Sequence, residues 1–495
     1  MERPTSMNDL PPELLGEIFY QCTTHSPDAP LLLSRVSRNF HQVVYSTPGI
    51  WYHLHLPITE TTGVACDRKV ELWFSVGGLC MVDITLDVRR VSFDDGRAQS
   101  TSPSKELLAA ELSVSGVLRR RVDRLRSLKL QASSEMDAQS FLDAIFTLPL
   151  DTDAVVALTS LTLQISPDAR LAPIVNRGSS LPAQPHFPFL PKLTDLILIN
   201  HGIAPLATTH LINLQTLSIT LPIRFPSLPL HIILHILRST TSLVQFNLEA
   251  RVVDAPPPHS DHATGDVEHN NTLIYLPHLT GLSLRTNSVS YILPHLLLPN
   301  LTSLRIDDLD GRRIGSAESV ENLLRKLLVR MDLPCPDRVG SGGLKTLELV
   351  NVPILRGAGE TEGVWDWCFR RMKSLVGLTV SNIDASPVLD ILASRNEEGE
   401  AICPQLANLS ITSSTPPLEI EMFRTQRPDI DLKFHVIADP FGGGDFDFIS
   451  HYENPTPAGA PSSPPSALPF RGSFPYISVH SRLDKEITEQ AGCAR

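Results

Sequence analysis

The stretch Leu301-Thr302-Ser303-Leu304-Arg305-Ile306 contains the pattern that decides the fold, L-x-x-L-x-L with isoleucine in the last apolar position. The last two apolar residues are two positions apart, which places them on one face of a short strand, and the first packs from the preceding turn. Such a unit leaves an apolar face that only a neighbouring unit can cover. Repeated copies are therefore expected to stack.

The pattern occurs ten times with conservative substitutions, and successive first leucines are between 21 and 43 residues apart. The copies begin at Leu125, Leu158, Leu193, Leu214, Leu243, Leu279, Leu301, Leu344, Leu375 and Leu406. Between them, apolar residues recur at helical spacing in the segments 136–148, 230–237, 317–331, 363–372 and 387–395. The sequence therefore predicts an α/β fold. It resembles an irregular leucine-rich-repeat-like solenoid, with long, uneven repeats and no fixed asparagine after the strand. A leucine-rich α/β domain of another topology is the alternative.

A second organising stretch begins with Leu10-Pro11-Pro12-Glu13-Leu14-Leu15-Gly16-Glu17-Ile18-Phe19. Asp9 and the prolines suit the start of a helix. Pro27 and Pro30 are expected to end that helix and open the next, which carries an apolar stripe from Leu32 to Val44. Two short helices cannot bury this much apolar surface against each other. Part of it must contact the rest of the chain or a partner.

This stretch resembles an F-box through three spaced signatures, L-P-x-E-L-L-x-x-I-F, L-S-R-V-S-R-x-F and P-x-x-W, between Leu10 and Trp51. The resemblance implies docking on the Skp-type adaptor of a cullin-RING ubiquitin ligase. Carried over residue by residue, the adaptor contacts are Leu10, Pro11, Glu13, Leu14, Ile18, Phe19, Leu33, Val36, Phe40 and Val43. Some of these are expected to form the core of the module instead. Trp51 is expected to pack the box onto the following domain.

The segment from Glu71 to Leu86 adds a second resemblance. It is similar to the segment that often follows the box in F-box-like proteins of mushroom-forming fungi, although the usual Arg-Ser and Pro-Leu are missing. Within it, apolar residues alternate with polar ones, which predicts a half-buried strand ending near Val88.

These patterns divide the chain into four parts. They are a helical F-box module (5–55), a connecting α/β segment (56–121), the repeat solenoid (122–437) and a Pro-, Gly- and Ser-rich, mostly disordered tail (438–495). The connecting segment is expected to end in a helix over 106–121. Two polar insertions, 166–189 and 253–271, are predicted as surface loops. Residues 418–436 are a candidate for the closing cap.

The composition indicates a largely globular chain: 42% of the residues are hydrophobic and 19% are charged. The formal net charge of −12 argues against a nucleic-acid binder, which normally has a basic face. The seven cysteines are scattered without C-x-x-C spacing, so neither a disulfide framework nor a zinc knuckle is expected. No apolar run approaches the roughly 20 residues that a membrane span needs. The predicted location is therefore the cytoplasm, the nucleus or both.

The sequence offers no catalytic constellation, cofactor motif or metal site. The group His259, Asp261, His262, Asp266 and His269 has metal-binding side chains. We interpret it as a solvated loop, because its Pro-flanked context supplies no rigid frame. Cys22, Cys368 and Cys403 lie among apolar residues, as core cysteines do.

Two clusters leave alternatives open. Trp365, Trp367 and Phe369 either pack in the core or provide a binding hot spot, because tryptophan is enriched in such sites. The run Arg119-Arg120-Arg121, with Arg124 and Arg126, is interpreted as a solvated helix face. A nuclear-import or acidic-partner role is its alternative.

The sequence thus predicts a substrate-recognition subunit of an SCF-type (Skp–cullin–F-box) ubiquitin ligase that is not itself an enzyme. The box would dock the adaptor, and the strand face of the repeats would hold an unknown protein substrate. A non-catalytic repeat scaffold acting outside a ligase is the main alternative. An α/β enzyme is a third hypothesis, but it requires convergent titratable residues in a pocket, which the sequence does not offer.

Overall fold

The structure is a computed structural model, and it describes residue 7 and residues 10–59, 62–88, 105–146, 156–166, 190–202, 211–222, 227–253, 273–309, 319–332, 343–354, 363–395, 399–413 and 419–436. All of them belong to one compact unit, Met1–Asp447. The predicted loops 166–189 and 253–271 lie almost wholly outside the described residues, as do the histidine-rich group and the tail after residue 437.

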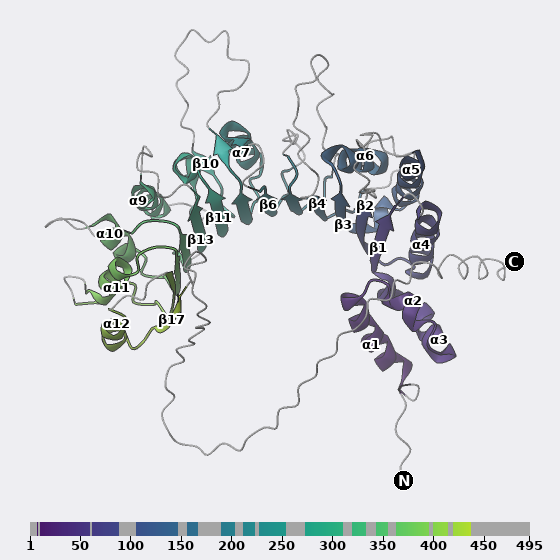
Figure 1. Ribbon diagram of the computed structural model, residues 1–495, viewed down its shortest axis with the longest axis horizontal. Coiled ribbons are helices and arrows are strands. Elements are labelled where there is room, and N and C mark those ends of the chain that lie inside the picture. Colours follow the sequence, from purple (N-terminus) through teal and green to yellow (C-terminus); the bar gives the residue numbers. More distant parts are fainter. Residues whose placement is uncertain are drawn as a thin grey trace, which may run out of the picture. The chain divides into compact units, whose positions relative to one another are not determined.

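One large parallel sheet of thirteen strands organises this unit (Figure 1). Its strands follow the order of the chain, so each new strand is added beside the previous one. They are β1 (His53–Ile58), β2 (Val82–Val88), β3 (Leu125–Ala132), β4 (Ser160–Ile165), β5 (Asp195–Ile199), β6 (Thr216–Thr220), β8 (Gln245–Glu249), β11 (Gly281–Thr286), β13 (Ser303–Asp308), β14 (Thr346–Val350), β15 (Gly377–Ser381), β16 (Asn408–Ser413) and β17 (Asp431–Val436). The predicted α/β class is confirmed.

Each of the ten L-x-x-L-x-L copies forms one strand of this sheet, from β3 to β16. Every apolar position of the pattern is at most 2% exposed. In eight copies, the N–H of the first leucine donates to the carbonyl three residues earlier, which closes a turn before the strand. The residues between the leucines point to the opposite face, so the strand period of two separates a core face from an open face.

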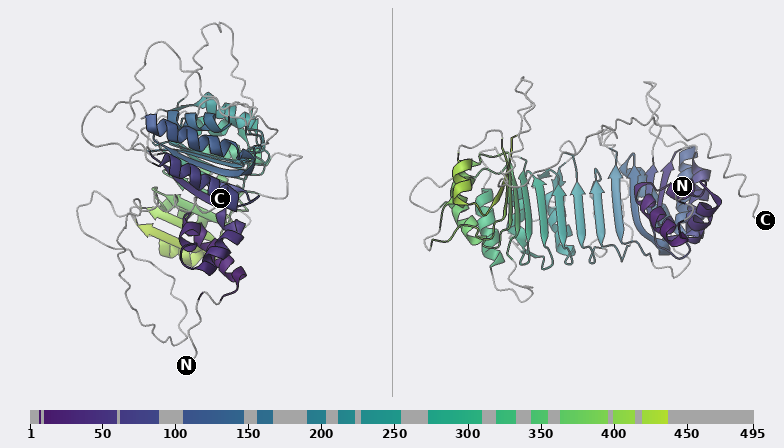
Figure 2. Two further views of the ribbon diagram at one scale, coloured as in Figure 1. Left: turned by 90° about the vertical axis from the view of Figure 1, so that its right-hand side faces the viewer. Right: turned by 90° about the horizontal axis from the view of Figure 1, so that it is seen from below.

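Twelve α-helices lie in the described part of the chain. They are α1 (Pro12–His25), α2 (Ala29–Leu33), α3 (Arg38–Ser46), α4 (Gly63–Val76), α5 (Lys105–Arg119), α6 (Glu135–Phe146), α7 (Leu230–Ser239), α8 (Val289–Ile292), α9 (Val320–Met331), α10 (Val364–Arg371), α11 (Ser386–Ala393) and α12 (Ile420–Gln426). Figures 1 and 2 show the labelled helices from α4 onward along one face of the sheet, the face into which the leucines point. All five helices expected between repeats are present, as is the helix expected at the end of the connecting segment.

Short elements complete the unit. Two small parallel pairs join β7 (Leu228–Pro229) to β9 (Val252–Val253) and β10 (Ile274–Tyr275) to β12 (Leu296–Leu297). The described residues also include the 3-10 turns η2 (Pro48–Trp51), η3 (Val122–Arg124) and η5 (Leu293–His295).

The boundary predicted between residues 55 and 56 falls inside β1, and the segment predicted as a connection supplies the rest of β1 and all of β2, the first two strands of the same sheet. β1 pairs with β2, and β2 pairs with β3, both in parallel. At the other end, β17 pairs with β16, and α12 and β17 both fall within the residues expected to close the array.

The outer edge of β1 is covered by side chains of the next helix and the turn before it. Unpaired strand edges invite association with other chains, so such covering has a protective value. The carbonyls of His53, His55 and Pro57 accept hydrogen bonds from Trp73 Nε1, Lys69 Nζ and Thr62 Oγ1, each at 2.8 Å. Pro57 also has no N–H that would need a partner.

The N-terminal module contains three short helices where two were predicted. α1 ends at His25 before Pro27, and Pro30 lies in the first turn of α2, as expected. The expected second helix, however, is broken between Leu33 and Arg38. The reason is Ser37, whose hydroxyl accepts a hydrogen bond from Phe40 N at 3.2 Å and so caps α3. The expected cap Asp9 lies outside the described residues.

Candidate functional site

Large apolar side chains are exposed along α1 and α2, and we call them the α1–α2 apolar surface. They are Leu14, Ile18, Leu32 and Val36, which expose 54%, 37%, 57% and 65% of their areas. Leu14 and Ile18 are four positions apart on α1. Leu32 and Val36 are likewise four positions apart. The chain continues in a helical turn past α2, with Val36 N donating to Leu33 O at 3.1 Å. Residues four apart on such a turn lie on the same side of it. Exposed apolar groups gathered on one small module are typical of a protein-binding surface.

The opposite sides of the same helices build the core of the module. Phe19 is buried, and its ring meets that of Phe40 edge-on, with centroids 4.8 Å apart. Val43 is buried as well. These three residues were among the expected adaptor contacts, but the structure places them inside, where they shape the module and present no surface to a partner.

Some of the other expected contacts are exposed and some are half-buried. Pro11 and Glu13 are exposed at the start of α1, and Leu10 and Leu33 are half-buried. Leu32 was not among the expected contacts but is exposed as well, and its position four residues before Val36 was the available signal. Tyr20 of α1 is also exposed, with its ring 5.2 Å from that of Tyr52.

Trp51 joins the helical module to the sheet, as predicted. Its indole N–H donates to Val44 O at 2.9 Å, and its ring meets Trp73 of α4 edge-on at 4.8 Å. Both tryptophans are fully buried. A second tie is the ion pair between Lys69 of α4 and Asp28, at 2.5 Å. The α1–α2 apolar surface is therefore held on a rigid base.

The open face of the sheet carries a polar network across five neighbouring repeats. Arg285 Nη1 lies 2.7 Å from Glu249 Oε1, and its Nε lies 3.1 Å from Asp307 Oδ2. Asp307 Oδ1 accepts from Asn351 at 2.8 Å, and Asn351 accepts from Asn382 at 3.2 Å. Both asparagines have positive φ just after their strands, a conformation that asparagine tolerates better than most residues. This part of the face is thus polar and internally hydrogen-bonded, with one guanidinium shared between two carboxylates.

Two histidines lie at the β1 end of the same face. Burial lowers the pKa of His53, with Asp83 opposing the shift. Burial lowers the pKa of His55 as well, and the charge of Lys69 lowers it further. Both imidazoles are therefore neutral at physiological pH.

The basic run is used in part for structure. Arg124 donates to the carbonyl of Phe74, in the last turn of α4, at 2.9 Å. It also donates to the carbonyl of Cys80, which follows α4, at 3.1 Å. Arg126 forms a two-pronged pair with Asp83, at 2.8 and 2.5 Å. Contacts within the chain therefore explain two of the five arginines of the basic run, and these two need no partner protein.

Two buried cysteines are chemically inert. Burial raises the pKa of both the Cys368 and the Cys403 thiols to about 12. At pH 8 roughly one such thiol in ten thousand is ionised, and the thiolate is the reactive form.

We expect iodoacetamide at pH 8 to leave Cys368 and Cys403 of the native protein unmodified, while the partly exposed Cys22 and Cys80 react. Peptide mass spectrometry measures the labelled fraction at each position. Denaturation should make all four react. Labelling of native Cys368 as fast as Cys22 would contradict the assignment.

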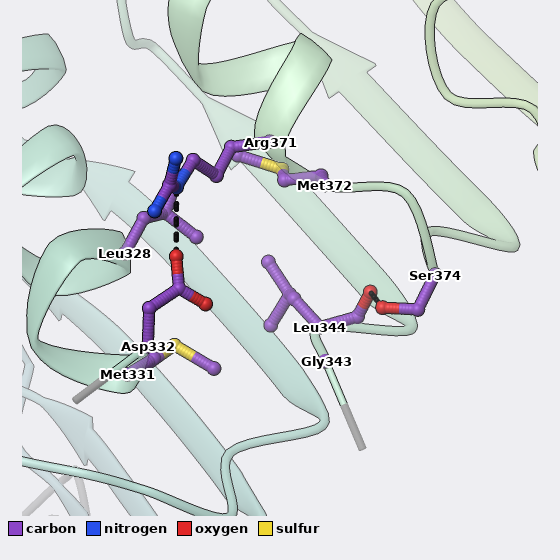
Figure 3. Close-up of a pocket in the computed structure, with 8 residues that line it drawn as sticks. All are labelled: Leu328, Met331, Asp332, Gly343, Leu344, Arg371, Met372 and Ser374. Carbon is purple, nitrogen blue, oxygen red and sulfur yellow. Dashed lines mark hydrogen bonds and ion pairs between the residues drawn. The ribbon is translucent and has the colours of Figure 1, made fainter. Parts of the chain in front are cut away.

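The described residues offer little room for a small ligand. The pocket in Figure 3 holds about 30 Å³, close to the volume of one water molecule. No group of three or more histidine, cysteine, aspartate or glutamate side chains in the described part is arranged to hold a metal ion. Among the described helices, none has the length and apolar character to cross a membrane.

Comparison with known proteins adds no relative. No model of a protein family matches the chain, and no curated protein is significantly similar to it.

Proposed function

We propose that this protein is a substrate-recognition subunit of an SCF-type ubiquitin ligase, in which residues 10–51 form an F-box that docks a Skp-type adaptor. The observation that carries the proposal is the α1–α2 apolar surface. Four large apolar side chains remain exposed on a module whose core is already filled by Leu15, Phe19 and Phe40. A partner that covers them would gain about 1.5–3 kcal/mol for each side chain fully removed from water.

The repeats supply the second half of the proposal. We interpret the thirteen-stranded sheet with its helices as a leucine-rich-repeat-like solenoid, because the strands follow chain order and each unit covers the apolar face of its neighbour. Its open strand face offers ordered polar groups, which suits a protein substrate. The protein would then act by proximity, raising the local concentration of substrate lysines near the ubiquitin carrier.

Co-expression with a Skp-type adaptor tests the first half. We expect the full-length protein to copurify with the adaptor at equal stoichiometry through gel filtration. Failure to form this complex would overturn the docking proposal.

The alternative is a repeat scaffold that acts outside a ligase, and the same polar strand face favours it equally. Addition of cullin and its RING subunit separates the two functions. A ligase subunit assembles into the larger complex and promotes ubiquitylation, whereas a scaffold would bind its partner without recruiting cullin.

A further inference from the structure

The helices α9 and α10 present an aromatic ring between two guanidinium groups. The Cζ atoms of Arg325 and Arg371 lie 5.1 and 5.4 Å from the centroid of the Trp367 ring. Arg371 is also fixed by Asp332, whose Oδ2 lies 2.7 Å from its Nε (Figure 3). We call Arg325, Trp367 and Arg371 the Trp367 surface.

Burial separates this ring from its neighbours in sequence. Trp365 and Phe369 are fully buried and stack on each other at 5.7 Å, so they belong to the core. Of the four tryptophans in the chain, Trp51, Trp73 and Trp365 have no exposed area, whereas Trp367 is half-buried. Core packing accounts for the first three, whereas Trp367 packs only partly against the core and also contacts two arginine side chains.

The arginines of α9 and α10 are not equivalent. Arg330 donates to the carbonyls of Pro294 and Leu296, at 2.7 and 3.3 Å. Arg371 is engaged by Asp332. Arg325 is exposed and, within the described part of the chain, lies over the Trp367 ring without an ion pair. A cation–π contact satisfies none of the five N–H donors of a guanidinium, whose planar fork matches a carboxylate.

The helices α9 and α10 carry an excess of positive charge, opposite in sign to the net charge of the chain. α9 and α10 together carry five basic and two acidic side chains, whereas the whole chain has a net charge of −12. Val329, one turn after Arg325 on α9, adds an exposed apolar group. Tryptophan and arginine are also the residues most enriched among binding hot spots.

From this geometry we propose that the Trp367 surface docks an acidic protein segment, with carboxylates at the edge of Arg325 and apolar contacts on Trp367 and Val329. The pocket beside Arg371 takes no more than a water molecule, so recognition occurs on the surface of the two helices. This interaction is separate from adaptor docking, which uses α1 and α2.

Fluorescence anisotropy of the full-length protein with a short fluorescein-labelled peptide, made of glutamates with a leucine at every third position, tests the proposal. We expect saturable binding that weakens as salt is raised. Arg325→Glu and Trp367→Ala should each weaken it by about tenfold or more. Arg68→Glu is the matched control, because Arg68 is an exposed arginine on α4, outside both the Trp367 surface and the basic run. The affinity of this variant for the peptide should stay within twofold of that of the unaltered protein.

Four outcomes would overturn the proposal. They are no binding by the unaltered protein, unchanged binding by both Arg325→Glu and Trp367→Ala, an equal loss in Arg68→Glu, and binding only of a peptide in which phosphoserine replaces glutamate. Because Arg325 is exposed and unpaired within the described part of the chain, its variant folds even if Trp367→Ala does not, which circular dichroism verifies. The two proposals fail independently, since adaptor copurification should be unaffected by Arg325→Glu.

Discussion

Leu14→Asp combined with Val36→Asp is expected to abolish capture of a Skp-type adaptor. Both side chains are more than half exposed, so the free protein should remain folded. In the complex, each change removes an apolar contact and buries an unpaired carboxylate, and both effects oppose binding. A combined cost of about 4 kcal/mol or more corresponds to roughly a thousandfold weaker affinity. Isothermal titration calorimetry with the purified adaptor measures the change.

The matched control is Leu112→Asp on α5, because Leu112 exposes 58% of its area, close to the value for Leu14. It should bind the adaptor normally. Full binding by the double variant would show that the adaptor does not use the α1–α2 apolar surface. Phe40→Asp would be a poor test, because Phe40 is buried against Phe19 and its loss would act through unfolding of the module.

Trp51→Ala is expected to destabilise the N-terminal part of the protein by about 3–5 kcal/mol, the range for removing a large aromatic side chain from a core. The change empties a fully buried site, removes the edge-on contact with Trp73 and leaves Val44 O without its indole donor. Urea unfolding followed by far-ultraviolet circular dichroism should show an earlier transition. Limited trypsin digestion should cut sooner after Arg35 and Arg38.

Two variants separate the causes of this loss. Trp51→Phe keeps an aromatic ring but no indole N–H, so it should lose clearly less stability than Trp51→Ala. Trp367→Ala removes a partly buried tryptophan and should cost clearly less stability than Trp51→Ala, because less of the ring is taken from the core. Equal transitions for Trp51→Ala and the unaltered protein would mean that Trp51 does not join the module to the sheet.

The repeating strands and their intervening helices could be predicted from the sequence. The L-x-x-L-x-L pattern has a period of two that fixes which side chains turn inward, and it recurs often enough to specify a stacked sheet. The assignment of β1 and β2 to this sheet could not be predicted in the same way. β1, with the sequence HLHLPI, has no repeat signature, and its place depends on pairing with a strand well separated from it along the chain.

The break between α2 and α3 shows a similar limit. Periodicity continues from Leu32 to Val44, so the pattern favours one helix, but the Ser37 hydroxyl competes with the helix by capping Phe40 N. The break lets Val36 face solvent while Phe40 faces the core.

The sequence by itself determined the α/β class, the positions of the ten repeat strands and the set of apolar residues in the N-terminal module. Only the tertiary structure decided which of those residues are core and which are surface, and that Trp365 is fully buried while Trp367 is only partly buried. The physical reason is that hydrophobic periodicity records which side chains avoid water in the final state of the chain. It does not record whether the covering comes from the same molecule or from a partner, and packing of distant segments settles that question.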